Sequence, residues 1–129
     1  METSVPETTL LTFVEPLPGF PDQEYTLDAI DPNGVLQSLR SVERPELRFV
    51  LARAEAFFPG YAPELSDALA TPLGSDEVEL LLVLTLGNGL SDATANLRAP
   101  IALARATDRA IQVVLDDDSL SMHAALATH

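Results

Sequence analysis

The stretch "VELLLVLTL" (Val78–Leu86) is the most apolar run of the chain, and Glu79 is its only charged residue. It is too short to cross a membrane, and its length and β-branched residues favour a strand over a long helix. Apolar side chains on both faces of a strand must both be covered by other parts of the protein. We therefore expect a central strand here, buried on nearly both faces.

Around this run, ten prolines and six glycines divide the chain into short apolar stretches separated by turns. "EYTLDAI" (Glu24–Ile30), for example, alternates between apolar and polar side chains as a half-buried strand does. The other stretches with strand character are residues 9–14, 35–41, 47–54, 93–106 and 111–120. About two helical turns fit residues 62–70, and the segment 121–129 is weakly helical or frayed.

This pattern predicts an all-β or mostly β fold, a small antiparallel β-barrel-like domain with at most one or two short helices. The length suits a single domain over residues 1–129, in which we expect residues 1–8 and 124–129 to be flexible. We expect the protein to be a monomer.

"ATANLRAPIALA" (residues 93–104) is an unusual strand candidate. Every second residue is apolar, which predicts a core face made of Ala95, Leu97, Ala99, Ile101 and Leu103. The other face carries Asn96, Arg98 and Pro100 in a row. Because proline removes a donor from the ladder, a bulge is expected here, with Pro100 ending the pairing. The same three residues are candidates for contact with a partner, and Arg98 has the longest reach.

The charge of the chain is strongly one-sided. Twenty acids face seven arginines, lysine is missing, and the formal net charge is −13. Nucleic-acid phosphates and anionic membranes attract clustered lysine and arginine, so this composition argues against direct binding to either. Two interpretations stay open: the acidity keeps the protein soluble, or it steers a basic protein partner toward it.

The sequence offers no catalytic, cofactor-binding or metal-binding constellation. Cysteine is missing, and both histidines, His123 and His129, lie in the C-terminal tail. The run Asp116–Asp118 lacks the spacing and the glycine of a calcium loop, so we interpret it as a solvated strand end. The amino terminus carries acids where a signal peptide carries basic residues, so we expect a cytoplasmic protein.

The stretch "FFPGY" holds Phe57, Phe58 and Tyr61, three of the seven aromatic residues, beside a Pro-Gly turn. These side chains either cap one end of the core or stand partly exposed as an anchor for a partner. A small-molecule-binding β-barrel, or a hydrolase that uses two carboxylates, is the alternative function. That alternative requires a deep apolar pocket with convergent polar groups.

Three stretches together resemble one family, the bacterial flagellar assembly factor FliW. They are "LPGF" (Leu17–Phe20), "LQSL…PELRFVLARAEAFFPGYAPEL" (Leu36–Leu65) and "LLVLTL…DATANLRAPIAL…QVVLDD" (Leu81–Asp117). The similarity extends from about Phe13 to about Leu126, with the motifs in the family's order. "FFPGY" followed by "ATANLRAPI" and "QVVLDD" is its most specific part.

The resemblance implies a small, acidic, barrel-like protein without catalytic activity or cofactor. FliW-like proteins bind CsrA, an RNA-binding regulator of translation, and prevent it from repressing flagellin synthesis. They also bind newly made flagellin as a chaperone, and flagellin competes with CsrA for them. From the resemblance and the residue pattern together, we expect partner contacts at Phe57, Phe58, Tyr61, Asn96, Arg98, Ala99 and Pro100. CsrA, if the host encodes it, and flagellin are the expected partners.

Overall fold

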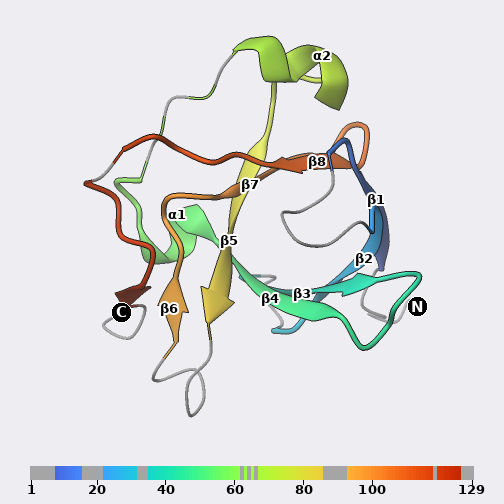
Figure 1. Ribbon diagram of the computed structural model, residues 1–129, viewed down its shortest axis with the longest axis horizontal. Helices are drawn as coiled ribbons and strands as arrows, with labels where there is room; N and C mark the ends of the chain where they lie inside the picture. The colour runs from blue at the N-terminus through green and yellow to red at the C-terminus, as the bar shows by residue number, and fades with distance from the viewer. Residues whose placement is uncertain are drawn as a thin grey trace, which may run out of the picture.

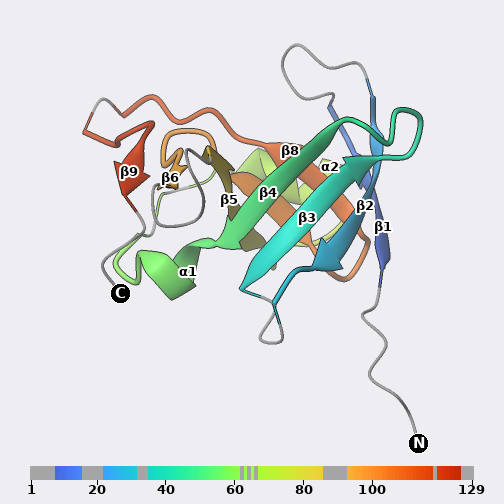
Figure 2. The same ribbon diagram turned by 90° about the horizontal axis from the view of Figure 1, so that it is seen from below.

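The computed structural model is a barrel of strands with short elements packed on its outside (Figures 1 and 2). It describes residues 8–15, 22–31, 35–61, 63, 65, 67–85, 93–117 and 119–125. The barrel strands are β1 (Thr9–Phe13), β2 (Glu24–Ala29), β3 (Leu36–Ser41), β4 (Arg48–Arg53), β5 (Glu79–Thr85), β7 (Ile101–Ala104) and β8 (Arg109–Gln112). Outside the barrel lie β6 (Thr94–Ala95), β9 (Ala124–Ala125), the helices α1 (Ala54–Phe57) and α2 (Ala70–Leu73), and the 3₁₀ turn η1 (Asp67–Leu69).

The order of strands around the barrel is β4-β3-β2-β1-β8-β7-β5, and β5 pairs back to β4 to close the ring. This arrangement confirms the mostly β, barrel-like fold that the sequence predicts. The pairs run antiparallel, but β1 and β8 pair in parallel, where Thr12 lies opposite Arg109 and Phe13 opposite Ala110. The strands expected at residues 9–14, 24–30, 35–41, 47–54 and 78–86 are confirmed as β1 to β5, with small differences at their ends.

Side chains from every second strand residue fill the interior of the barrel. Its core residues are Leu11, Phe13, Tyr25, Leu27, Leu39, Leu51, Leu81, Ile101, Leu103 and Ala110. The rings of Phe13 and Tyr25 meet edge to face with their centroids 5.2 Å apart, a favourable arrangement for an aromatic pair. The alternation seen in "EYTLDAI" therefore sorts the side chains of β2 as expected.

Strand β5 is buried on both faces, as its sequence predicts. Leu81 and Val83 point into the barrel core. Leu80, Leu82 and Leu84 point outward and pack in two further clusters. One of these, the outer cluster, has a buried set of Ala52, Ala54, Leu82, Leu84, Ala93 and Ala95. The other lies against α2 and includes Leu73, Ala102, Ala104 and Ile111.

The stretch 93–104 does not form the single strand that its alternation predicts. Leu84 of β5 lies opposite Ala95 of β6, and Leu81 lies opposite Ile101 of β7. Residues 96–100 therefore stand opposite only residues 82 and 83, and the extra residues leave the ladder as the expected bulge. We call the segment Asn96–Pro100 the strap.

The strap also changes which side chains are buried. Ala95, Ile101 and Leu103 are buried as predicted. Leu97 and Ala99, which the alternation assigned to the same core face, are only half-buried. Pro100, assigned to the opposite face, is buried, because the ladder is interrupted and the alternation does not carry across the strap.

The helical segment begins later than predicted. Residues 67–69 form η1 and residues 70–73 form α2, so the helix extends beyond its predicted end at residue 70. Pro72 is tolerated because it lies in the first turn, where a main-chain N–H has no partner within the helix. Gly74 ends α2 in the left-handed region with φ 75°, and its N–H bonds to the carbonyls of Ala70 and Thr71. Helix α1, which follows β4 directly, was not expected.

The C-terminal part also differs from expectation. Strand β8 covers residues 109–112 rather than 111–120, and Ala124 and Ala125 form β9 instead of a helical turn. The turn expected at residues 87–92, and all of those expected at residues 15–22 and 31–34 except Glu15, Asp22 and Asp31, lie outside the described residues. The flexibility expected for residues 1–8 and 124–129 stays a prediction, and of these residues the structure describes Thr8, Ala124 and Ala125.

We predict that Leu81→Ala lowers the free energy of unfolding by about 2–5 kcal/mol, because it opens a cavity in the filled barrel. Leu10→Ala is the matched control, since Leu10 is 53% exposed on β1, and its effect should stay within about 0.5 kcal/mol. Urea unfolding followed by circular dichroism measures both. Equal losses in the two variants would contradict the assignment of the core.

Candidate functional site

The aromatic loop Phe57–Tyr61 lies outside the barrel, against the outer face of β4 and β5. Helix α1 reverses the chain after β4, and the N–H of Phe58 bonds to the carbonyl of Ala54 at 2.8 Å. The N–H of Tyr61 then bonds to the carbonyl of Phe58 at 2.9 Å, which closes a turn around exposed Pro59 and Gly60. The three aromatic side chains are half-buried and pack on the outer cluster, so each has both a covered and an open part.

The strap is held by hydrogen bonds at each of its ends. The N–H of Asn96 bonds to the carbonyl of Val83 at 3.1 Å, and its side-chain oxygen accepts the N–H of Arg98 at 3.0 Å. Asn96 thus satisfies a main-chain group within the bulge. At the other end, the carbonyl of Pro100 accepts the N–H of Val113 at 2.8 Å.

The aromatic loop and the strap adjoin in space. The hydroxyl of Tyr61 donates to the carbonyl of Leu97 at 2.6 Å, and Leu97 packs on the same outer cluster as Phe57 and Phe58. Burial of this hydroxyl raises the pKa of Tyr61 to about 12. The structure therefore brings the two candidate patches of the sequence into one continuous surface.

Arg98 faces the segment that follows β8. Its Nε donates to the carbonyl of Asp117 at 3.2 Å, while its own carbonyl accepts the N–H of Leu115 at 2.6 Å. The side-chain and main-chain groups of Ser119 donate to the Asp117 carboxylate, and with the nearby charge of Arg98 they lower the pKa of Asp117. One of the seven arginines thus ties the strap to an acidic segment.

A groove of about 480 Å³ lies beside Tyr61, between the aromatic loop and the segment after β8. Its lining combines apolar groups with two carboxylates. The lining residues are Gly60, Tyr61, Pro63, Leu115, Asp116, Asp117 and Leu120. Such a groove suits an apolar partner segment that carries a basic side chain.

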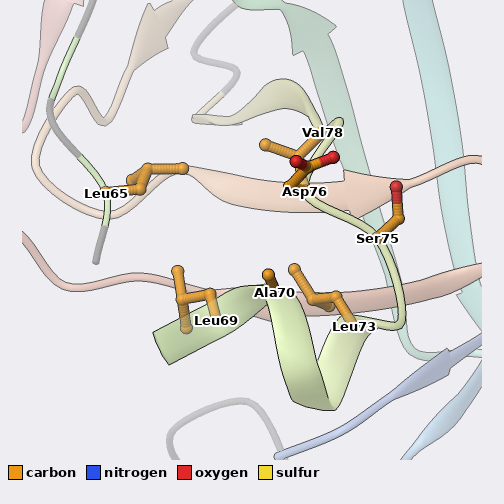
Figure 3. Close-up of a pocket in the computed structure, with 7 residues that line it drawn as sticks. All are labelled: Leu65, Leu69, Ala70, Leu73, Ser75, Asp76 and Val78. Atoms are coloured by element: carbon orange, nitrogen blue, oxygen red, sulfur yellow. The ribbon is translucent and has the colours of Figure 1, made fainter. Parts of the chain in front are cut away.

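A second cleft, of about 310 Å³, lies beneath α2 on the outside of the barrel (Figure 3). Leu69, Ala70 and Leu73 form one wall and face Val78 and Asp76 across the opening. The interior of the barrel itself is packed with the core side chains. The deep central pocket that a small-molecule-binding barrel needs is therefore not seen among the described residues.

Several charged groups of the described residues form ion pairs. Arg44 bonds to the buried Asp22 at 2.7 Å, and this pair lowers the pKa of the Asp22 carboxyl. At another position, Glu79 lies between Arg53 at 3.4 Å and Arg105 at 2.8 Å. The described residues contain no group of three or more histidine, aspartate or glutamate side chains arranged to hold a metal ion.

Residues 1–126 match the FliW protein family. The chain belongs to the FliW family. It is 33% identical over 123 residues to the flagellar assembly factor FliW of Shouchella clausii, a match that covers 92% of this chain and 84% of that protein. The flagellar assembly factor FliW of Bacillus subtilis is 30% identical over 122 residues, which cover 92% of this chain and 85% of that protein.

A solved structure shares the fold as well. The crystal structure of a flagellar assembly factor FliW superposes with a TM-score of 0.82 at 28% identity, covering 94% of this chain and 87% of that chain. The family that the sequence motifs suggest is thus confirmed. No helix in the described parts of the chain is long and apolar enough to cross a membrane.

Sequence reasoning missed several residues of this candidate surface. Leu97 was assigned to the barrel core, and Leu115 and Leu120 were not singled out. Asp116 and Asp117 were interpreted only as part of a solvated strand end, whereas they also line the groove. Half-buried leucines at the end of a strand give no local signal of a groove, because the opposite wall comes from a distant part of the chain.

We predict that Tyr61→Phe lowers the free energy of unfolding at neutral pH by roughly 1 kcal/mol, because the Leu97 carbonyl loses its donor. The free energy of unfolding of the variant should also depend less on pH in alkaline solution. The pKa of Tyr61 is higher in the folded protein than in the unfolded chain, so stability falls as pH rises from about 10 toward 12. Tyr61→Phe removes that contribution, and unfolding in urea at several pH values measures it. Identical alkaline slopes for wild type and variant would refute this assignment.

Proposed function

We propose that this protein is a non-enzymatic flagellar assembly factor that binds CsrA, flagellin or both. Membership in the FliW family supports this role, because the relatives it resembles are named flagellar assembly factors. By binding CsrA it would relieve the repression of flagellin synthesis, and by binding flagellin it would act as a chaperone. Flagellin would then set how much CsrA is free. Both partners are made in the cytoplasm, where we place the protein as a monomer.

We propose the joined surface of the aromatic loop and the strap as the place of binding. The observation that carries this is the bond from the Tyr61 hydroxyl to the Leu97 carbonyl, which makes two separate sequence motifs one surface. The contact residues proposed are Phe57, Phe58, Tyr61, Asn96, Arg98, Ala99 and Pro100. The three aromatic side chains are half-buried, and Tyr61 lines the groove. Partly exposed aromatic groups of this kind are typical anchors of protein interfaces.

The net charge of −13 supports CsrA as one partner. An RNA-binding protein presents basic surface, which an acidic protein attracts at long range, and nearby RNA is repelled at the same time. Asp116 and Asp117 place negative charge at the groove itself, so steering and docking would favour the same face.

The alternative of a small-molecule-binding barrel or a carboxylate-based hydrolase finds less support. Its ligand would need the interior of the barrel, which the core side chains occupy. The clefts of the described residues lie outside the barrel and are open to solvent. We therefore favour a protein-binding role.

A competition experiment tests the proposed function. The protein is immobilised, and flagellin and CsrA from the same organism are offered separately and then together. We expect binding to one or both, with each partner displacing the other where both bind. The association rate for CsrA should fall as salt rises, because exposed charges farther apart than about 10 Å are screened at 0.1 M salt. No binding of either partner at tens of micromolar would refute the proposal.

Phe58→Ala tests the surface. We expect the variant to fold with reduced stability and to bind its partner about tenfold more weakly or worse, because an anchor is lost. Phe49→Ala is the matched control, since Phe49 is also half-buried but packs against the barrel core. It should lose stability and keep its affinity. If the folded Phe58→Ala variant binds with unchanged affinity, Phe58 is not part of the binding surface.

A further inference from the structure

The chain stays extended after β8, and within the described part of the structure its main chain pairs along one side only. The N–H of Val113 bonds to the carbonyl of Pro100, and the N–H of Leu115 bonds to the carbonyl of Arg98. In an antiparallel ladder the main-chain groups of successive residues point to alternate sides. The N–H and C=O groups of Val114 and Asp116 therefore point away from the strap.

That side of the strand is already used for pairing earlier in the chain. The N–H of Thr12 bonds to the carbonyl of Asp108 at 3.0 Å, and that of Val14 bonds to the carbonyl of Ala110 at 2.9 Å. Even-numbered residues of this strand thus face β1. Beyond β8 the chain runs on past the end of β1 (Figure 1), and no described residue bonds to the main chain of Val114 or Asp116. An added strand would lie in line with β1.

The side chains of this edge fit a partner with a basic group. Val114 is 72% exposed, more than the other exposed large hydrophobic residues of the described chain. Asp116 and Asp117 are exposed beside it. Proteins usually blunt a free edge with lysine or proline, and the stretch 112–117 contains neither. The two carboxylates disfavour pairing with a second copy of this acidic chain.

We propose that the main-chain edge at Val114 and Asp116 takes up an extended segment of flagellin as an added strand. The segment would bond to both main chains, cover the Val114 side chain, and set a lysine or arginine against Asp116. This inference rests on the proposed function and specifies how one partner binds. A flagellin segment that is unfolded before assembly has main-chain groups that are free to pair with this edge.

Val114→Pro tests the edge directly. Proline removes the N–H that the added strand needs, and no described residue accepts a hydrogen bond from that N–H, so the fold should be kept. We expect flagellin to bind this variant about tenfold more weakly or worse. Val114→Ala keeps the N–H and serves as the matched control, with a loss below about threefold. The affinity for CsrA should be unchanged in both variants. Asp116→Lys should weaken flagellin binding at low salt, and its difference from the wild-type protein should shrink as salt rises.

Full affinity of folded Val114→Pro for flagellin would overturn the inference. If that variant does not fold, hydrogen exchange of the wild-type protein decides instead: saturating flagellin should slow exchange at the amides of Val114 and Asp116. Unchanged exchange at both amides in the complex would overturn the inference alone. A wild-type protein that binds neither flagellin nor CsrA would overturn the proposed function together with it.

Discussion

Strand β5 has apolar side chains on both faces, and the fold supplies a different cover for each. Leu81 and Val83 are buried by closing the barrel, which requires β5 to pair with β4 on one edge and β7 on the other. Leu80, Leu82 and Leu84 then remain on the outside. Leaving such area in water costs on the order of 25 cal/mol for each Å², so the chain must cover the outer face as well.

The elements that cover Leu82 and Leu84 on this outer face are the ones that form the candidate site. The aromatic loop packs over Leu82 and Leu84, and the strap carries Leu97 into the same cluster. Because the strap leaves the ladder, its carbonyls become available to Tyr61, Val113 and Leu115. Those bonds place the acidic segment after β8 beside the aromatic loop. One constraint, the burial of β5 on its second face, thus leads to the groove and to the free edge.

Part of this arrangement is readable in the sequence. The apolar run at residues 78–86 predicts the central strand, and Asn96 with Pro100 predicts an interrupted ladder, because both effects are local. The number of residues in the interruption is not local, since it depends on the register of β5 against two other strands. For the same reason the sequence could not reveal that Tyr61 reaches Leu97, which lies far along the chain. The shift of the helix to residues 70–73 follows from Gly74, which supplies the left-handed end only at that position.

One NMR titration can test the claim that the aromatic loop and the strap, which cover the outer face of β5, form the recognition surface. The ¹⁵N-labelled protein is titrated with unlabelled CsrA or flagellin, and the change of each amide signal is followed. The account predicts that the largest changes lie in residues 57–61, 96–100 and 112–117. Changes confined to β2 and β3, on the part of the barrel away from this cover, would contradict it.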